Sequence, residues 1–125
     1  MREQIFGPTH SIYVPLSPEA GVNYENDCTY IETHEKEFYS ELFMGDKTVF
    51  LFETVYFKLS SELDLLWLDY AEEETIPFEK LEPAKRIAES IMQQQTDEKK
   101  KELIQHFIDL LQKAIDCKSC LMVMA

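Results

Sequence analysis

The sequence predicts an α+β fold, in which a small antiparallel sheet packs against an antiparallel pair of C-terminal helices and a further short helix lies near residues 34–44. Residues 47–59 predict the central strand, because this run is rich in β-branched and aromatic residues and is apolar on both faces. Residues 83–94 and 97–116 predict the helices, because each carries apolar residues at helical spacing. At 125 residues, the chain is expected to form a single domain, residues 1–125.

The first quarter of the chain mixes strand and loop signals. Residues 10–16 alternate between apolar and polar side chains, which predicts a strand. Pro15 assigns this strand to the edge of a sheet, because proline cannot donate to a central ladder. Residues 18–26 predict a loop, and residues 28–32 predict a short strand.

Two later segments depend on competing patterns. In residues 34–44, bulky apolar side chains form a helical stripe, and Gly45 suits the position after a helix end. Residues 60–74 fit either a helix capped by a serine or a hairpin whose second strand is residues 65–70. We favour the hairpin, because the preceding strand needs a pairing partner. Residues 121–125 predict a last strand or a packed tail.

Capping residues support the C-terminal helix pair. Pro83 suits the first turn of one helix, and Thr96 is a candidate N-cap of the next. Asp97 and Glu98 would then lie in the first turn, where the helix dipole favours negative charge. Because only a few residues separate the two helices, we expect them to pack antiparallel.

Charge is unevenly distributed along the chain. The sequence has 24 acidic and 12 basic residues, a formal net charge of −12. Residues 1–76 hold 16 of the acidic residues and 4 of the basic ones, whereas residues 77–125 hold 8 of each. A negative field of this size repels phosphates, so we expect no direct binding to nucleic acid. A basic protein partner is expected to bind the front part of the chain.

No motif in the sequence identifies a reaction. Cys117 and Cys120 form a CxxC pair, but they follow the end of a helix, where the dipole does not stabilise a thiolate. His34 and Glu35 begin an HExxH-like pattern, but Phe38 replaces its second histidine, so one-turn zinc chelation is impossible. We therefore expect no catalytic residue, no metal and no cofactor, and we expect that the protein is not an enzyme.

Compartment signals favour the cytoplasm. The N-terminal residues lack the apolar core of a secretory signal. The longest apolar run, residues 121–125, is far shorter than the about 20 residues of a membrane span. An odd number of cysteines, 3, suits a reducing environment. We expect a cytoplasmic protein with no membrane partner.

Acidic residues interleaved with tyrosines remain as the candidate for function. Charge speeds the encounter with a basic partner, and buried aromatic residues hold it. The candidate partner-binding residues are Glu35, Glu37, Glu41, Asp64, Asp69, Tyr70, Glu72, Glu73 and Glu74. The opposing interpretation is that the acidic residues only keep the domain soluble and the aromatic residues only fill its core.

The leading hypothesis is a small acidic inhibitor that binds and neutralises a basic protein. An immunity protein or antitoxin against a nuclease-type toxin is its sharpest form, because such a toxin has a basic cleft and fast association protects the cell. One alternative is a DNA mimic that acts on a nucleic-acid-binding enzyme and needs carboxylates at phosphate-like spacing. Another is a small cofactor-free enzyme or ligand-binding domain, which needs an apolar pocket with convergent polar groups.

Overall fold

The structure, a computed structural model, describes residues 8–65 and 73–124. It consists of a four-stranded antiparallel sheet and a set of helices, so the predicted α+β class is confirmed. In chain order the elements are β1 (Thr9–Pro15), α1 (Pro18–Asn26), α2 (Tyr30–Thr33), the 3-10 turn η2 (Glu35–Glu37), β2 (Phe38–Met44), α3 (Asp46–Phe50), the π-helix η3 (Leu51–Tyr56), α4 (Phe57–Leu63), β3 (Glu73–Ile76), α5 (Phe78–Gln93), α6 (Glu98–Asp116) and β4 (Leu121–Met124).

The sheet has the strand order β2-β1-β4-β3, and every neighbouring pair is antiparallel. Because β1 pairs with both β2 and β4, it lies inside the sheet, and the prediction of an edge strand was wrong. Pro15 is tolerated there because it is the last residue of β1, and the pairing with β4 extends only from Ser11 to Tyr13. The position of a proline within a strand therefore matters as much as its presence.

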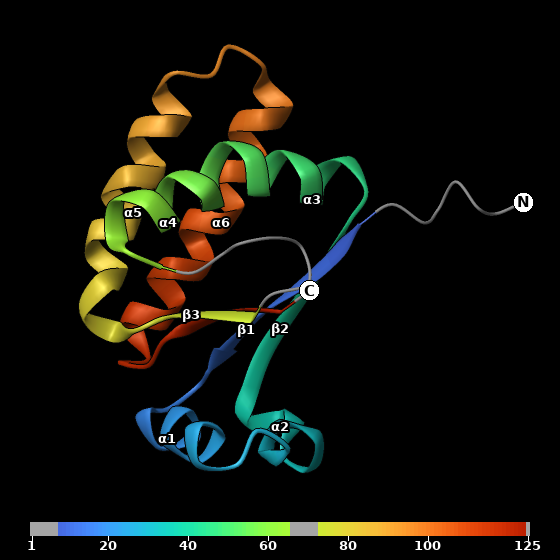
Figure 1. Ribbon diagram of the computed structural model, residues 1–125, viewed down its shortest axis with the longest axis vertical. Helices are drawn as coiled ribbons and strands as arrows, with labels where there is room; N and C mark the ends of the chain where they lie inside the picture. The colour runs from blue at the N-terminus through green and yellow to red at the C-terminus, as the bar shows by residue number, and fades with distance from the viewer. Residues whose placement is uncertain (1–7, 66–72, 125) are drawn as a thin grey trace, which may run out of the picture.

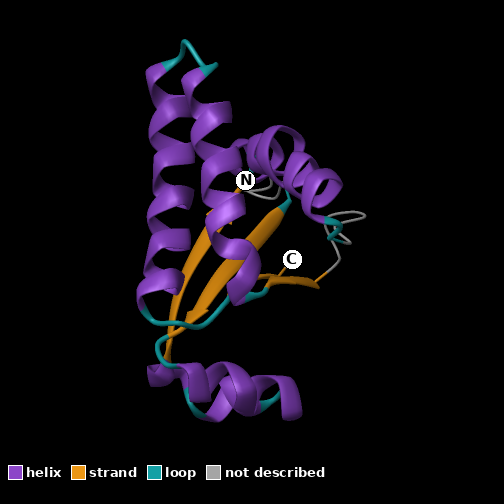
Figure 2. Ribbon diagram, turned by 90° about the vertical axis from the view of Figure 1, so that its left-hand side faces the viewer, coloured by secondary structure: helices purple, strands orange, loops and turns teal. Residues whose placement is uncertain are grey.

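Helices cover one face of the sheet, as Figures 1 and 2 show. Ile12 and Val14 of β1, and Leu121 and Val123 of β4, are fully buried against this helical layer. The helical side of the core comes from α5, α6 and the continuous helical segment α3–η3–α4. Its fully buried residues are Leu51, Phe52, Val55, Tyr56, Leu59, Leu81, Ala84, Ala88, Ile104, Phe107, Leu111 and Ala114.

Residues 47–59 are helical, so the predicted central strand was wrong. This segment packs against both the sheet and another helix: Phe52 and Tyr56 set their rings edge-on against His10 of β1, and Tyr56 also packs against Phe107 of α6. A helix that packs against two neighbours carries a wide apolar face. Its sequence then resembles that of a buried strand, and hydrophobic periodicity cannot separate the two.

The predicted helix over residues 34–44 was also wrong, because most of this segment is β2. All of β2 pairs with β1, from Phe38 opposite Pro15 to Met44 opposite Thr9. This non-local pairing supplies the backbone hydrogen bonds, and a stripe of apolar residues gives no sign of it. Residues 35–37 form one 3-10 turn before the strand.

Residues 18–26 form α1 rather than the predicted loop, and residues 30–33 form α2 in place of the predicted strand at residues 28–32. The start of α1 is capped, since Ser17 Oγ accepts a hydrogen bond from the backbone N–H of Ala20 at 3.1 Å. These short helices lie at the lower end of the sheet in Figure 1. There they form a second, smaller apolar cluster on the other face of the sheet, centred on Ala20, Phe38 and Met122.

The C-terminal helix pair is confirmed, with ends that differ from the prediction. Helix α5 begins at Phe78, so Pro83 lies inside the helix instead of in its first turn. The N-cap of α6 is Asp97 and not Thr96, because Asp97 Oδ1 accepts a hydrogen bond from the backbone N–H of Lys99 at 2.8 Å. Strand β4 shows that residues 121–124 form a last strand, which is the first of the two alternatives given for this segment.

The segment at residues 60–74 is described in part. Residues 60–63 belong to α4, so the hairpin turn favoured there was wrong. The proposed second strand, residues 65–70, lies outside the described residues except for Leu65, which is buried. Among the helices that the structure describes, none is both long and apolar enough to span a bilayer.

Candidate functional site

The structure divides the predicted partner-binding residues between the two edges of the sheet. Glu35, Glu37 and Glu41 lie on η2 and β2, whereas Glu74 lies on β3. Because β1 and β4 separate the two edge strands, these groups are about 14 Å apart across the sheet. Asp64 ends α4 in the left-handed conformation and is exposed. The remaining predicted residues are Asp69, Tyr70 and Glu72, which lie outside the described residues, and Glu73, described only as the first residue of β3.

Glu41 is the most constrained of these acidic residues. Its carboxylate accepts a hydrogen bond from Tyr39 Oη at 2.8 Å and contacts His106 Nε2 of α6 at 3.0 Å. Partial burial alone would raise the pKa of Glu41, but the hydrogen bonds from Tyr39 and His106 outweigh it and hold the pKa below its usual value. Glu41 is therefore a fixed negative charge between β2 and α6.

Glu35 and Glu37 lie on η2, between Glu41 and the short helices α1 and α2. Tyr30 Oη donates a hydrogen bond to Glu37 Oε1 at 2.7 Å, and this bond raises the pKa of the tyrosine. Glu35 is exposed; its backbone oxygen accepts a hydrogen bond from Phe38 N–H, and its carboxylate has no hydrogen-bond or ion-pair partner among the described residues. We refer to Glu35, Glu37 and Glu41 together as the acidic edge.

A groove runs beside the acidic edge, between β2 and α6. It consists of two hollows that share His106, with volumes of about 490 Å³ and 270 Å³. His106 forms the middle of the groove, where its ring sets edge-on against Phe43 with centroids 5.7 Å apart. At one end of the groove, Lys113 Nζ lies 4.8 Å from the centre of the Tyr39 ring. The residues along the groove are Tyr39, Glu41, Leu42, Phe43, Met44, Lys47, Glu102, Leu103, His106, Asp109, Leu110 and Lys113.

The sheet face of β2 that points away from α6 carries exposed apolar side chains. Leu42 is 59% exposed and Met44 is 55% exposed. The strand alternation explains this, because Glu41 and Phe43 face α6 and their neighbours must face the other way. Leu42 and Met44 are therefore an apolar pair that the described residues leave exposed.

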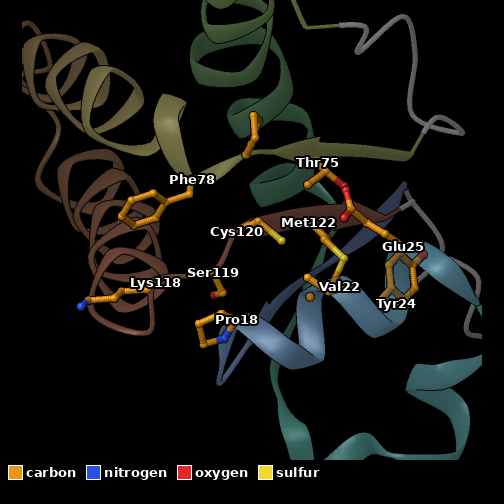
Figure 3. Close-up of a pocket in the computed structure, with 12 residues that line it drawn as sticks. Pro18, Val22, Tyr24, Glu25, Thr75, Phe78, Lys118, Ser119, Cys120 and Met122 are labelled. Carbon is orange, nitrogen blue, oxygen red and sulfur yellow. The ribbon is translucent and has the colours of Figure 1, made fainter.

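A second pocket lies on the same open face of the sheet, between α1 and the segment from β3 to α5 (Figure 3). Its volume is about 290 Å³, and Val22 and Phe78 at its sides are 53% and 49% exposed. Cys120 points into the pocket in Figure 3, and burial, together with nearby Glu25, raises the pKa of its thiol to about 11. The neighbouring Ser119 Oγ donates a hydrogen bond to the backbone oxygen of Pro15 at 2.7 Å. The pocket can hold an apolar group, but these two side chains are poor nucleophiles there.

His10 is a buried polar residue that sequence analysis did not single out. Its Nδ1 lies 3.0 Å from Thr48 Oγ1 and its Nε2 lies 2.8 Å from Tyr56 Oη, so both ring nitrogens have partners. The ring also stacks on Phe43 and is 1% exposed. Burial lowers the pKa of His10 to about 4, which keeps the imidazole neutral near pH 7. The sequence did contain a signal for the burial of His10. It lies two residues before the buried Ile12, so in a strand both side chains point to the same face.

The other candidate metal or redox residues do not form a cluster. Cys28, Cys117 and Cys120 are free thiols. His34 is exposed and stacks on Tyr30, with ring centroids 3.9 Å apart. Among the residues that the structure describes, no group of three or more His, Cys, Asp or Glu side chains is placed to hold a metal ion.

Comparisons of the chain with protein-family models, with curated proteins and with solved structures find no match. The fold and the site geometry above are therefore the basis for the functional argument.

Proposed function

We propose that this protein is a small acidic inhibitor that binds and neutralises a basic protein, and that it acts by binding and not by catalysis. Its sharpest form is an immunity protein or antitoxin that covers the basic cleft of a nuclease-type toxin. The observation that carries the proposal is the acidic edge, where Glu35, Glu37 and Glu41 follow one another along η2 and β2 and Glu41 lines an open groove.

The charge of the molecule supports electrostatic steering toward such a partner. The formal net charge is −12, and the short helical part α1–α2–η2 contributes to it with Glu19, Glu25, Asp27, Glu32, Glu35 and Glu37 against the single base Lys36. This part lies at one end of the sheet, away from the neutral helix pair α5–α6 (Figure 1). A field concentrated at one end raises the association rate and orients the encounter.

Exposed apolar residues next to the acidic edge supply the apolar surface that a stable complex must bury. Surface ion pairs add little affinity each, so a stable complex also needs apolar surface that becomes buried. Leu42 and Met44 are more than half exposed, and they lie on β2, the strand that also carries Glu41. Charge would set the association rate, and these residues would slow dissociation.

Co-purification with salt-dependent kinetics tests this proposal. The tagged protein is used to isolate basic proteins from its source cells, and the association rate of the isolated partner is measured from low to high salt. The double variant Glu35→Lys/Glu37→Lys should slow association and flatten its salt dependence. The matched control Glu53→Lys/Glu98→Lys changes the charge equally at exposed helical positions and should have a smaller effect. The proposal is wrong if no basic partner is isolated, or if the control slows association more.

A second candidate function, a ligand-binding domain, is favoured by the pocket in Figure 3. Its lining is largely apolar and includes Pro18, Val22, Phe78 and Met122 together with Cys120. A small apolar ligand would be the fitting occupant. Thermal stabilisation of the chain by a library of apolar compounds, lost in the variant Val22→Arg, would favour this function over the first.

A further inference from the structure

Strand β2 stands at one end of the sheet, and within the described residues it pairs only with β1. The backbone groups on its other side therefore lack a strand partner in that part of the chain. An edge of this kind is a template for β-strand addition, in which main-chain hydrogen bonds supply affinity and alternate side chains supply specificity.

The groove lies where the side chains of an added strand would point. Helix α6 runs alongside β2 in the opposite direction. Two contacts show this: His106 contacts Glu41, and Lys113, later on α6, reaches Tyr39, earlier on β2. Residues directly opposite one another on paired strands point to the same face. Side chains opposite Tyr39, Glu41 and Phe43 would thus enter the hollows below α6, which have volumes of about 490 Å³ and 270 Å³.

We propose that this edge receives an extended segment of the basic partner as a fifth strand, with an arginine or lysine opposite Glu41 and apolar residues on either side of it. This inference rests on the proposed function and specifies how the partner binds. The side chains of the segment that face away from α6 would cover Leu42, which is 59% exposed.

Charge complementarity determines the position of the basic residue. Glu41 and His106 lie in the middle of the groove, where His106 Nε2 contacts the Glu41 carboxylate at 3.0 Å. Toward the two ends, the hollow with Lys47 also contains Glu102, and the hollow with Lys113 also contains Asp109. Each lysine is therefore offset by a carboxylate of its own hollow, and the further carboxylate, Glu41, makes the middle the favoured position for a cation.

The same charges argue against a second copy of this chain as the occupant. Glu41 is the central residue of β2, so a symmetric antiparallel pair of β2 strands would set two Glu41 side chains opposite one another. Like charges in that position are destabilising, and each copy also carries a net charge of −12. The occupant is accordingly a different, basic chain.

Synthetic strand peptides test the inference directly. The probe is the capped heptapeptide Thr-Val-Thr-Arg-Thr-Val-Thr, whose symmetric order fits β2 in either direction, and its counterpart has glutamate in the centre. Two further versions are N-methylated, one at residues 2, 4 and 6 and the other at residues 3 and 5. Binding is followed through backbone amide signals in NMR spectra of the full-length protein, with each dissociation constant obtained by titration.

The arginine peptide should shift the amide signals of β2 and bind about fivefold more tightly than the glutamate peptide. One methylated version should lose binding and the other should keep it, because alternate N–H groups of a strand point to opposite sides. The variant Glu41→Gln should reduce the preference for arginine, while Glu98→Gln, at an exposed position on α6, should not.

Three results would overturn strand addition: no shift within β2 with any peptide, equal binding of both methylated versions, or a preference for glutamate. If a basic protein is isolated by co-purification but these peptides fail, the proposed function stands and only this binding mode is wrong. If the peptides bind as expected but no basic protein is isolated, the edge is a peptide site and the inhibitor function is wrong.

Discussion

Acid should destabilise this fold through His10. The imidazole is buried between β1 and the π-helix η3, and its pKa is lowered to about 4 by burial. In the unfolded chain the pKa returns to its ordinary value near 6.5. The folded state therefore binds the proton less well than the unfolded state. The stability associated with neutral His10 is complete above pH 6.5 and is lost as the pH falls toward 4.

The size of the loss follows from the difference between the two pKa values. Protonation of His10 lowers the free energy of unfolding by about 2 kcal/mol at pH 5 relative to neutral pH. Below pH 4 this loss approaches about 3 kcal/mol. A domain of this size has a total stability of about 5–15 kcal/mol, so the effect is large enough to measure. Thr48 and Tyr56 remain next to the protonated ring, and both hydroxyl groups can accept hydrogen bonds.

The assay is urea unfolding at pH 7.5 and at pH 5.0, for the wild type and for His10→Gln, which has nothing to titrate at this position. The wild type should lose about 2 kcal/mol more than the variant between the two pH values. That corresponds to a midpoint shift of about 1 M urea. The reasoning is refuted if the His10 variant loses as much stability with pH as the wild type.

Two further predictions concern the caps and the thiols. Asp97→Ala should lower the free energy of unfolding by about 1 kcal/mol, because two backbone N–H groups of α6 lose their acceptor, whereas Thr96→Ala should have little effect; an equal loss in urea unfolding would contradict the assignment of the cap. Toward a disulfide reagent at pH 8, the exposed Cys28 should react quickly and Cys120 slowly, because burial holds the pKa of Cys120 at about 11. Mass spectrometry of peptides from timed reactions measures both rates, and faster labelling of Cys120 would contradict the burial.

The parts of the fold that could be predicted from sequence are those stabilised by local patterns. Helices α5 and α6 each show several turns of amphipathic repeat, and their short connection forces them to pack antiparallel. Even there the ends were wrong by a few residues. Pro83 indicates a helix start in general, yet here it lies in the second turn of α5.

The interchange of helix and strand between residues 34 and 59 has a common physical cause. Bulky apolar residues at 38–44 fit both periods, and those at 47–59 fit neither cleanly. Pairing with β1 makes the first segment a strand, and packing against both the sheet and α6 keeps the second a helix. Both causes are long-range, so intrinsic propensity was overridden.

The composition of the candidate site could be predicted from the sequence, but its geometry could not. The surplus of acidic residues was visible in the sequence, but only the sheet order separates Glu41 from Glu74. The groove depends on α6 lying beside β2, and residue spacing cannot indicate that arrangement. The burial of His10 could have been predicted from the sequence, because alternate residues of a strand share a face and His10 alternates with Ile12 and Val14.

Two glycines that look equivalent in the sequence should respond to alanine in opposite ways. Gly45 joins β2 to α3 with φ of +62° and ψ of −130°, a conformation that side chains other than glycine rarely adopt. No atom lies within 4 Å of an added Cβ there, so the cost of Gly45→Ala is a backbone cost of about 1–3 kcal/mol. Gly21 lies inside α1, and an added Cβ would meet Pro15 Cγ at 3.7 Å and Cys120 Sγ at 3.8 Å, which are ordinary contacts.

Gly21→Ala should therefore stabilise the fold by about 0.5–1 kcal/mol, because alanine loses less conformational freedom than glycine when the helix forms. Urea unfolding of the two single variants and the double variant measures both effects. Since the two positions lie on separate elements, the double variant should show their sum. A loss of stability in Gly21→Ala, or none in Gly45→Ala, would mean that the backbone at that glycine differs from the one described.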